Sequence, residues 1–424
     1  MPEESVLSDE LLRQLMSVGE VDVLVGLPTY NNAKTVGPVV QVIRTGLLKY
    51  FPRERAAILN TDGGSKDGTH ELVQAASISD SRASDSVHSL RTLHCISATY
   101  LGNPSSGTAL QTVLSAADLL RAKACVMIAP ESSSIVPEWI DRLLRPVYRN
   151  ECDYITPVYR RNRFEGLLIT NLIYPMTRAL YGVRIREPYS SEFGITGQFG
   201  AHLLAEPLWT QEAGRTGAEL GFTISALAEG CRIHQAFLGP KGQLEHSPAD
   251  LVAAMRSTVG TLFWSMGANY QRWSAVPETQ TPPTLGPEYE IDTDPVRVNR
   301  KRLHQIFSSG VVELEPILRS ILSASTVEQL KQAAAVPEDE FRYSDELWVR
   351  TVYEFAASYQ RAVISRDHII QALAPLFRGR TYTFMVENRE SSQQEVEDHI
   401  EALCQTFERL KPYLLDQWKV QGGA

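Results

Sequence analysis

The stretch AAILNTDGGSKDGT, residues 56–69, joins a short apolar run to an acidic, glycine-rich turn. Short apolar runs that end in turn residues are typical of buried strands. An earlier run, Val21 to Leu27, ends at Pro28, and apolar residues then recur with helical spacing from Val36 to Tyr50. These segments predict a repeating strand-helix unit at the start of the chain.

The same alternation continues through the first half of the chain. Apolar runs at residues 92–97, 124–129 and 154–158 alternate with helical patterns at residues 107–121 and 136–149. Near-continuous apolar strands separated by helices of this length predict an α/β fold, with a mainly parallel sheet covered by helices on both faces. Such sheets bind ligands at the carboxyl ends of their strands, so we expect the functional site in those loops.

From about residue 250 onward the strand signal fades and the pattern becomes helical, for example at residues 365–376 and 392–418. A chain of 424 residues is also too long for one ordinary α/β domain. We therefore predict an α/β domain over residues 1–250 and a helical C-terminal domain over residues 251–424. Long amphipathic helices such as 392–418 could pair between subunits, which leaves a homodimer open.

Composition and charge exclude several classes of protein. With 43% hydrophobic and 21% charged residues, the chain suits a globular protein with a sizeable core. The excess of 50 acidic over 41 basic residues argues against a protein that coats nucleic acid or an anionic membrane. The sequence has no membrane-span pattern, no secretory leader pattern and no CxxC pair among its five cysteines. We expect a cytoplasmic protein that holds anionic ligands through local groups.

Three common site motifs fail on their spacing. The loop after the first strand, PTYNNAKT, lacks the GxGxxG pattern of dinucleotide-binding folds. A P-loop requires a Lys directly before its Ser or Thr, and the segment GNPSSGT, residues 102–108, has none. Asp67 stands where a nucleophile elbow needs its last Gly. These failures disfavour dehydrogenase, kinase-like and hydrolase functions.

What remains is a set of polar segments: VGLPTYNN (25–32), NTDGGSKDGT (60–69), IAPESSS (128–134) and LEHSPADL (244–251). Together they resemble GT-A nucleotide-sugar glycosyltransferases, whose second strand ends in a D-[DG]-x-S-x-D-G-T turn. The resemblance is closer to the retaining group that contains glucosylglycerate, glucosyl-3-phosphoglycerate and mannosylglycerate synthases. Residues 135–140 and 169–194 look like two segments of that group, the second ending in SSEFG where the group has GGDFG.

The resemblance implies a retaining hexosyltransferase. It would move a hexosyl group, preferably glucose, from a nucleotide-diphosphate sugar such as UDP-glucose, GDP-glucose or GDP-mannose to a small anionic acceptor such as glycerate or 3-phosphoglycerate. It also implies a divalent metal, Mg²⁺ or Mn²⁺, to neutralise the leaving diphosphate. The alternative is a catalytically impaired paralogue that binds a nucleotide sugar or acts through protein partners. An inverting polysaccharide or lipid transferase is disfavoured because no membrane segment is evident.

The residues expected to bind the donor follow the first two strands and open a helix: Pro28, Tyr30, Asn32, Asp62, Gly63 and Ser106. Asp62 is placed to accept hydrogen bonds from a base or ribose, and Gly63 lets the backbone approach the ligand. The alternative for Asp62 is a turn residue that caps the following helix. Ser106 stands where the resemblance places a Lys, so a positive charge is lost there.

The resemblance also assigns the metal and catalytic positions. Glu131 aligns with the last Asp of a D-x-D metal motif whose first position is Ala129 here. Its carboxylate could still bind a hard cation, or it could cap the helix that begins near Ile135. His246 resembles the His that completes the metal site, since imidazole suits manganese-like ions. Glu192 is the candidate catalytic residue, placed to orient the sugar hydroxyls or the acceptor.

Three cations could bind the acceptor. Arg184, Arg186 and Lys241 would each suit a carboxylate or phosphate group. The alternative is that they are ordinary surface charges. The sequence therefore predicts a nucleotide-sugar donor and a small anionic acceptor as ligands, with no nucleic-acid or membrane partner.

Overall fold

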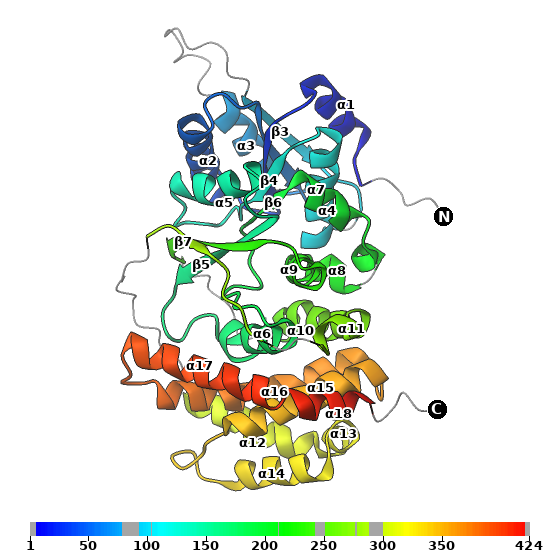
Figure 1. Cartoon of the computed structure of the whole chain (residues 1–424), viewed down its shortest axis with the longest axis vertical. Helices are drawn as coiled ribbons and strands as arrows, with labels where there is room; N and C mark the ends of the chain where they lie inside the picture. Colours follow the sequence, from blue (N-terminus) through cyan, green and yellow to red (C-terminus); the bar gives the residue numbers. More distant parts are fainter. Residues whose placement is uncertain are drawn as a thin grey trace. The chain divides into compact units, whose positions relative to one another are not determined.

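The computed structural model describes residues 6–78, 93–102, 104–210, 212–241, 251–275, 278–287 and 300–419 (Figure 1). Its contacts divide the chain into two compact units. The first comprises Met1–Arg160, Ser190–Leu244 and Pro282–Ile291, and the second comprises Arg161–Tyr189, Glu245–Thr281 and Asp292–Ala424. Residues 161–189 therefore group with the C-terminal helices and not with the sheet. The functional boundary near residue 250 stays a prediction.

The first unit is built on one sheet, which has eight strands among the described residues. The strands are β1 (Val23–Thr29), β2 (Ala56–Asp62), β3 (Leu93–Thr99), β4 (Ala124–Met127), β5 (Tyr154–Arg160), β6 (Phe193–Thr196), β7 (Ile233–Pro240) and β8 (Thr284–Leu285). Their order is β3-β2-β1-β4-β6-β5-β7-β8, and within this sheet only β6 runs antiparallel to its neighbours. The predicted α/β fold with a mainly parallel sheet is confirmed.

Helices cover both faces of this sheet. Successive strand residues point to opposite sides, and in β1 and β2 the residues on both sides are almost all buried. On one face, Val25 of β1 belongs to a core that includes apolar residues of α2 (Val36–Tyr50), α3 (Thr69–Ile78) and α5 (Glu138–Tyr148). The next residue, Gly26, faces α4 (Ser106–Leu119), and a Cβ added to it would lie 2.5 Å from Val113. The other helices of the first unit are α1 (Asp9–Val18), α7 (Gly197–Leu204), η2 (Pro207–Thr210), α8 (Glu212–Thr216) and α9 (Ala218–Glu229).

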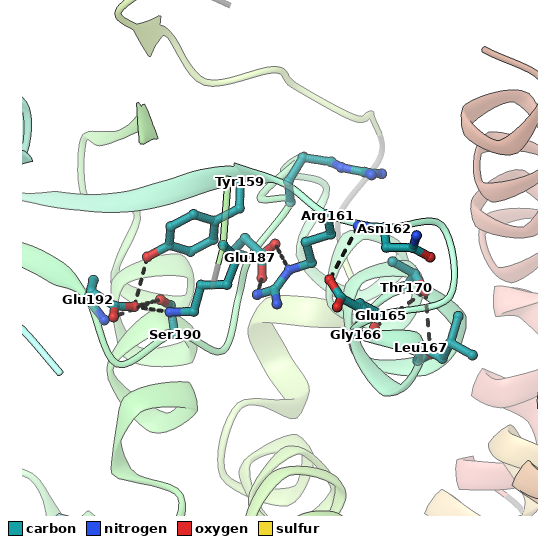
Figure 2. A network of polar contacts seen from close by, with 12 residues as sticks. Tyr159, Arg161, Asn162, Glu165, Gly166, Leu167, Thr170, Glu187, Ser190 and Glu192 are labelled. Carbon is teal, nitrogen blue, oxygen red and sulfur yellow. Dashed lines mark hydrogen bonds and ion pairs between the residues drawn. The ribbon is translucent and has the colours of Figure 1, made fainter. Parts of the chain in front are cut away.

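The second unit is helical, as expected for the C-terminal region, and its later helices are yellow to red in Figure 1. It contains η1 (Ile169–Ile173), α6 (Tyr174–Tyr181), α10 (Leu251–Ala268), α11 (Tyr270–Trp273), α12 (Arg300–Glu313), α13 (Glu315–Ile321), α14 (Ala324–Ala335), α15 (Asp345–Arg361), α16 (Arg366–Glu387), α17 (Gln393–Arg409) and α18 (Lys411–Lys419). Helix α17 packs against α6 and η1, which explains why residues 161–189 belong to this unit. Arg161 and Glu187 close that segment with two hydrogen bonds of 2.8 and 2.9 Å (Figure 2).

Two helices end differently from the sequence prediction. The pattern at residues 365–376 continues to Glu387 as α16, with Pro375 inside the helix. The helix continues because its later turns are buried, including Tyr382 and Phe384. The pattern at residues 392–418 is divided into α17 and α18 at Leu410. No helix in the described parts of the chain is both long and apolar enough to cross a membrane.

Candidate active site

The sheet topology brings the predicted site residues of the first unit to one edge. Strands β1, β2, β4, β5 and β7 are parallel, so their carboxyl ends lie at the same edge. Strand β6 is antiparallel and begins there, with Phe193 paired to Met127. Asp62 ends β2, Glu131 follows β4, Glu192 precedes β6 and Lys241 follows β7. Strand β1 separates β2 from β4, and this reversal of strand order is where open α/β sheets bind ligands.

Asp62 closes the turn that follows β2. Its buried carboxylate accepts hydrogen bonds from the backbone N–H groups of Gly64 (3.0 Å) and Ser65 (2.8 Å). The Ser65 hydroxyl donates to the other oxygen at 2.5 Å. The Thr29 hydroxyl lies 3.0 Å from that oxygen and 2.7 Å from Asn60 Oδ1, and it can donate its one proton to either. A carboxylate offers about four acceptor positions, so these contacts use most of them. Asp62 thus holds the turn but does not cap α3, which begins at Thr69, and its donor-binding role stays a prediction.

The loop after β1 is tied to the loop after β2. The backbone N–H of Asn31 donates to the Ser65 hydroxyl (2.8 Å), and the Asn31 side chain accepts from the N–H of Lys66 (3.1 Å). The Asn32 side chain accepts from the Tyr30 N–H at 2.7 Å, so it holds its own loop. The backbone beside the Tyr30 ring is therefore fixed.

The Tyr30 side chain lies beside the glycine turn and is 56% exposed. A Cβ added to Gly63 would lie 3.0 Å from both the Tyr30 ring and the Tyr100 hydroxyl. Only a glycine leaves these rings undisturbed at that position. Pro28 is half-buried within β1, paired with Thr61. The described geometry leaves the Tyr30 ring as an open aromatic surface.

Ser106 is the first residue of α4 and lies against a carboxyl group that the sequence did not single out. Ser105 caps this helix by accepting from the Thr108 N–H at 3.1 Å. Ser106 hydrogen-bonds to Glu219 of α9, whose second oxygen has no partner among the described residues. Burial raises the pKa of Glu219 to about 7, although bonds from its own backbone and Ser106 oppose the shift. A titratable acid thus lies beside the position where the resemblance expects a Lys.

Glu192 accepts hydrogen bonds from four side chains, of which Tyr159 and Ser190 are labelled in Figure 2. Its side chain is 0% exposed. The Ser132 hydroxyl donates to Oε1. Oε2 accepts from Tyr159 (2.8 Å), Ser190 (3.1 Å) and Lys241 (2.7 Å). The Lys241 ammonium also lies over the Tyr159 ring, 4.5 Å from its centroid. Neither Ser132 nor Tyr159 carried a sequence signal of its own, although Ser132 adjoins Glu131.

Electrostatics keep Glu192 ionised. Burial alone would raise its pKa, but the Lys241 charge and the hydrogen bonds from Lys241, Ser132 and Tyr159 outweigh burial and lower the pKa to about 2. Burial raises the pKa of Glu131, the negative charge of Glu192 adds to this shift, and Lys241 opposes it. Glu131, Glu192 and Lys241 therefore form one electrostatic group.

The residues described at this edge offer few metal ligands. Glu131 keeps its carboxylate, whereas Ala129 is buried and has no ligand atom. Glu192 is already held by Lys241 and three hydroxyls. Across the described ranges, no group of three or more His, Cys, Asp or Glu side chains is placed to hold a metal ion. His246 lies outside the described residues, so its predicted role is not tested.

Arg184 and Arg186 lie in the second unit, paired with glutamates of α17. Arg184 is 3.3 Å from Glu401, and Arg186 is 3.0 Å from Glu397. The Arg186 guanidinium also lies 5.0 Å from the centre of the Tyr174 ring. These pairs satisfy part of each guanidinium, and acceptor binding by the two arginines stays a prediction.

No protein-family model and no curated protein matches this sequence. Solved structures of glucosyl-3-phosphoglycerate synthase from Mycobacterium tuberculosis are similar. Its complex with phosphoglyceric acid and its complex with Mn²⁺, uridine-diphosphate and glucosyl-3-phosphoglycerate each share 20% identity with this chain. Each match covers 63% of this chain and 86% of that one, with a TM-score of 0.45.

Proposed function

We propose that the chain is a glycosyltransferase that moves a hexosyl group from a nucleotide-diphosphate sugar to a small anionic acceptor. The observation that carries the proposal is the gathering of Asp62, Glu131, Glu192 and Lys241 at the ligand-binding edge of a doubly covered, mainly parallel sheet. The turn that Asp62 holds contains Gly63, which would face the donor, and Lys241 supplies a positive charge for an anionic group. Both lie in the first unit.

The donor would lie over the loops after β1 and β2. The exposed Tyr30 ring would stack on the base, because aromatic rings stack on any base face. Gly63 would let the donor approach the backbone, beside the turn held by Asp62. The other proposed donor contacts are Pro28, Asn32 and Ser106.

A divalent cation, Mg²⁺ or Mn²⁺, would neutralise charge on the leaving diphosphate when bound. Such ions often use only one or two protein carboxylates, with water and substrate phosphates completing the shell. Glu131 fits that role as a single carboxylate, and we propose His246 as the second ligand. Its raised pKa means that Glu131 would bind the ion more readily as pH rises.

The acceptor charge would be received by Lys241 in the first unit. Acceptor binding by Arg184 and Arg186 of the second unit is a separate prediction. The resemblance implies retention, in which the acceptor proton passes to an oxygen of the leaving diphosphate. No strong protein base is then required. Glucose is the preferred sugar, and glycerate or 3-phosphoglycerate the preferred acceptor.

The decisive experiment is a donor panel with purified protein. UDP-glucose, GDP-glucose and GDP-mannose would each be offered with glycerate or 3-phosphoglycerate, in the presence of Mg²⁺ or Mn²⁺. We expect one combination to give product and Glu131→Ala to abolish it. The control is Glu151→Ala, because Glu151 is exposed and its distance to Arg149 is a loose 3.9 Å. A panel without turnover and without metal-dependent nucleotide binding would refute the proposal.

The second candidate is an impaired paralogue that only binds a nucleotide sugar. The changes at Ala129 and Ser106 favour it, because they remove an expected carboxylate and an expected cation. Calorimetry would distinguish the two candidates. Nucleotide binding without any turnover across the panel would support the paralogue.

A further inference from the structure

Lys241 is a cation whose side chain is held in place at the proposed site. Its side chain is only 14% exposed, and its ammonium is fixed between the Glu192 carboxylate (2.7 Å) and the Tyr159 ring (4.5 Å to the centroid). Its backbone N–H also donates to the carbonyl of Arg160 at 3.1 Å, so both ends of the residue are held. An ammonium on a long flexible stem usually loses rotamer entropy when it binds an anion. Here that cost is already met by folding.

The ammonium still has donor capacity. A Lys carries three N–H donors. Among the described residues, Glu192 is the acceptor that it contacts, and the Tyr159 ring receives its charge without consuming a hydrogen bond acceptor position. Counted over the described residues alone, two donors remain for an incoming anion. The side chain keeps enough exposure to be reached.

Glu192 is poorly suited to accept a proton. Four donors surround its carboxylate, and a pKa of about 2 makes it a weak base at neutral pH. Its contacts instead link two loops, because Ser132 lies next to Glu131 and Lys241 follows β7. A single carboxylate thus sets where the Lys241 charge lies relative to the loop that carries Glu131.

We propose that Glu192 and Tyr159 are positioning residues, which hold the Lys241 ammonium for the carboxylate or phosphate of an anionic acceptor. The inference rests on the proposed function and changes the expected role of Glu192 from a catalytic group to a support. It predicts that damage to the cluster weakens acceptor binding more than it slows transfer.

Steady-state kinetics on the full chain would test the proposal, with 3-phosphoglycerate as the acceptor probe. Lys241→Met is expected to raise the acceptor KM at least tenfold. Tyr159→Phe and Glu192→Gln are expected to raise KM with kcat within threefold. Lys241→Arg should recover part of the KM, because it keeps the charge.

Lys49→Met is the matched control. Lys49 also pairs with a glutamate, Glu138, at 2.9 Å and also lies over a tyrosine ring, that of Tyr50, at 4.7 Å. Its side chain is 55% exposed, however, and it lies in none of the proposed site loops. We expect no change in its acceptor KM.

The outcomes separate this inference from the proposed function. A fall in kcat with unchanged KM in Glu192→Gln would make Glu192 a catalytic base and overturn the inference. An unchanged KM in Lys241→Met would also overturn it while transfer itself stands. If the wild type turns over no donor, calorimetry with 3-phosphoglycerate decides: binding that Lys241→Met abolishes supports the inference without the activity, and binding that it leaves intact overturns it.

Discussion

The Thr29 hydroxyl at the end of β1 lies 3.0 Å from the Asp62 carboxylate at the end of β2. Both residues are buried, at 4% and 2% exposure. The contact joins two parallel strands at the point where their loops begin. It makes the Asp62 turn part of the sheet edge and not an independent surface loop.

Asp62→Asn should destabilise this turn. An amide oxygen can still accept from the Gly64 and Ser65 N–H groups, but the NH₂ group then faces the Ser65 and Thr29 hydroxyls, and the charge-assisted hydrogen bonds of the carboxylate are lost. We expect the free energy of unfolding to fall by about 1–3 kcal/mol, measured by urea denaturation. Asp118→Asn, at an exposed position, is the control and should cost little. Wild-type stability in Asp62→Asn would show that the turn does not depend on the carboxylate.

Two glycine substitutions should have opposite effects. A Cβ at Gly107 would lie 2.2 Å from the carbonyl oxygen of Gly214, which is backbone and cannot move aside cheaply. Gly107→Ala should therefore lower the melting temperature and loosen the start of α4. Gly260 lies inside α10 and has nothing within 4 Å of an added Cβ. Gly260→Ala should stabilise by about 0.5–1 kcal/mol, because alanine favours helices. A stable Gly107→Ala protein would contradict the packing described here.

Glu219 should make stability depend on pH. Its pKa is about 7 in the folded protein against 4.5 for the ordinary side chain, so the folded state holds its proton more tightly. The contribution of Glu219 to the free energy of unfolding is fully present below pH 4.5 and is lost as pH rises through 7.

Glu219→Gln removes this loss of stability at high pH, because the amide does not ionise. The free energy of unfolding of the variant should exceed that of wild type by on the order of 2 kcal/mol at pH 8 and by much less at pH 4. Chemical denaturation at a series of pH values would measure the difference. Glu229→Gln, at an exposed site on the same helix, should show no such trend. A pH-independent difference for Glu219→Gln would refute the assignment.

Arg178 should be essential to the second unit. Its side chain is 1% exposed and bonds Glu401 (2.6 and 2.9 Å) and Glu408 (2.8 and 3.3 Å). Arg178→Met takes this cation from Glu408 and leaves Glu401 with only its 3.3 Å pair to Arg184, so it should cost about 3–5 kcal/mol of unfolding free energy. Arg319→Met breaks an exposed pair on α13 and should cost under about 1 kcal/mol. Equal losses in the two variants would contradict the role of burial.

Local pattern was enough to find much of the sheet. The apolar runs at residues 124–129 and 154–158 correspond to β4 (Ala124–Met127) and β5 (Tyr154–Arg160). Strands β6 and β7 were not predicted. Strand β6 has only four residues, and its antiparallel direction depends on pairing with β4 and β5, which no local window contains. Because β6 begins at the edge where the parallel strands end, this missed strand is what places Glu192 there.

The candidate site shows the same division. The sequence singled out Asp62 by its glycine turn, Glu131 and Glu192 by the resemblance to the synthase group, and Lys241 as a cation suited to an anionic acceptor. It could not show that the Glu192 carboxylate would form an ion pair with Lys241, or that Glu219 would hydrogen-bond to Ser106. These contacts join residues far apart in the chain, so only folding brings them together.

The sequence by itself determined the α/β class, the helical C-terminal region and the loops that carry polar groups, since these follow from local periodicity and turn chemistry. Tertiary structure alone decided which charges meet and which remain available. Burial and ion pairing depend on long-range packing, and they leave the Glu192 carboxylate filled by donors and the Lys241 ammonium with two donors that no described residue accepts.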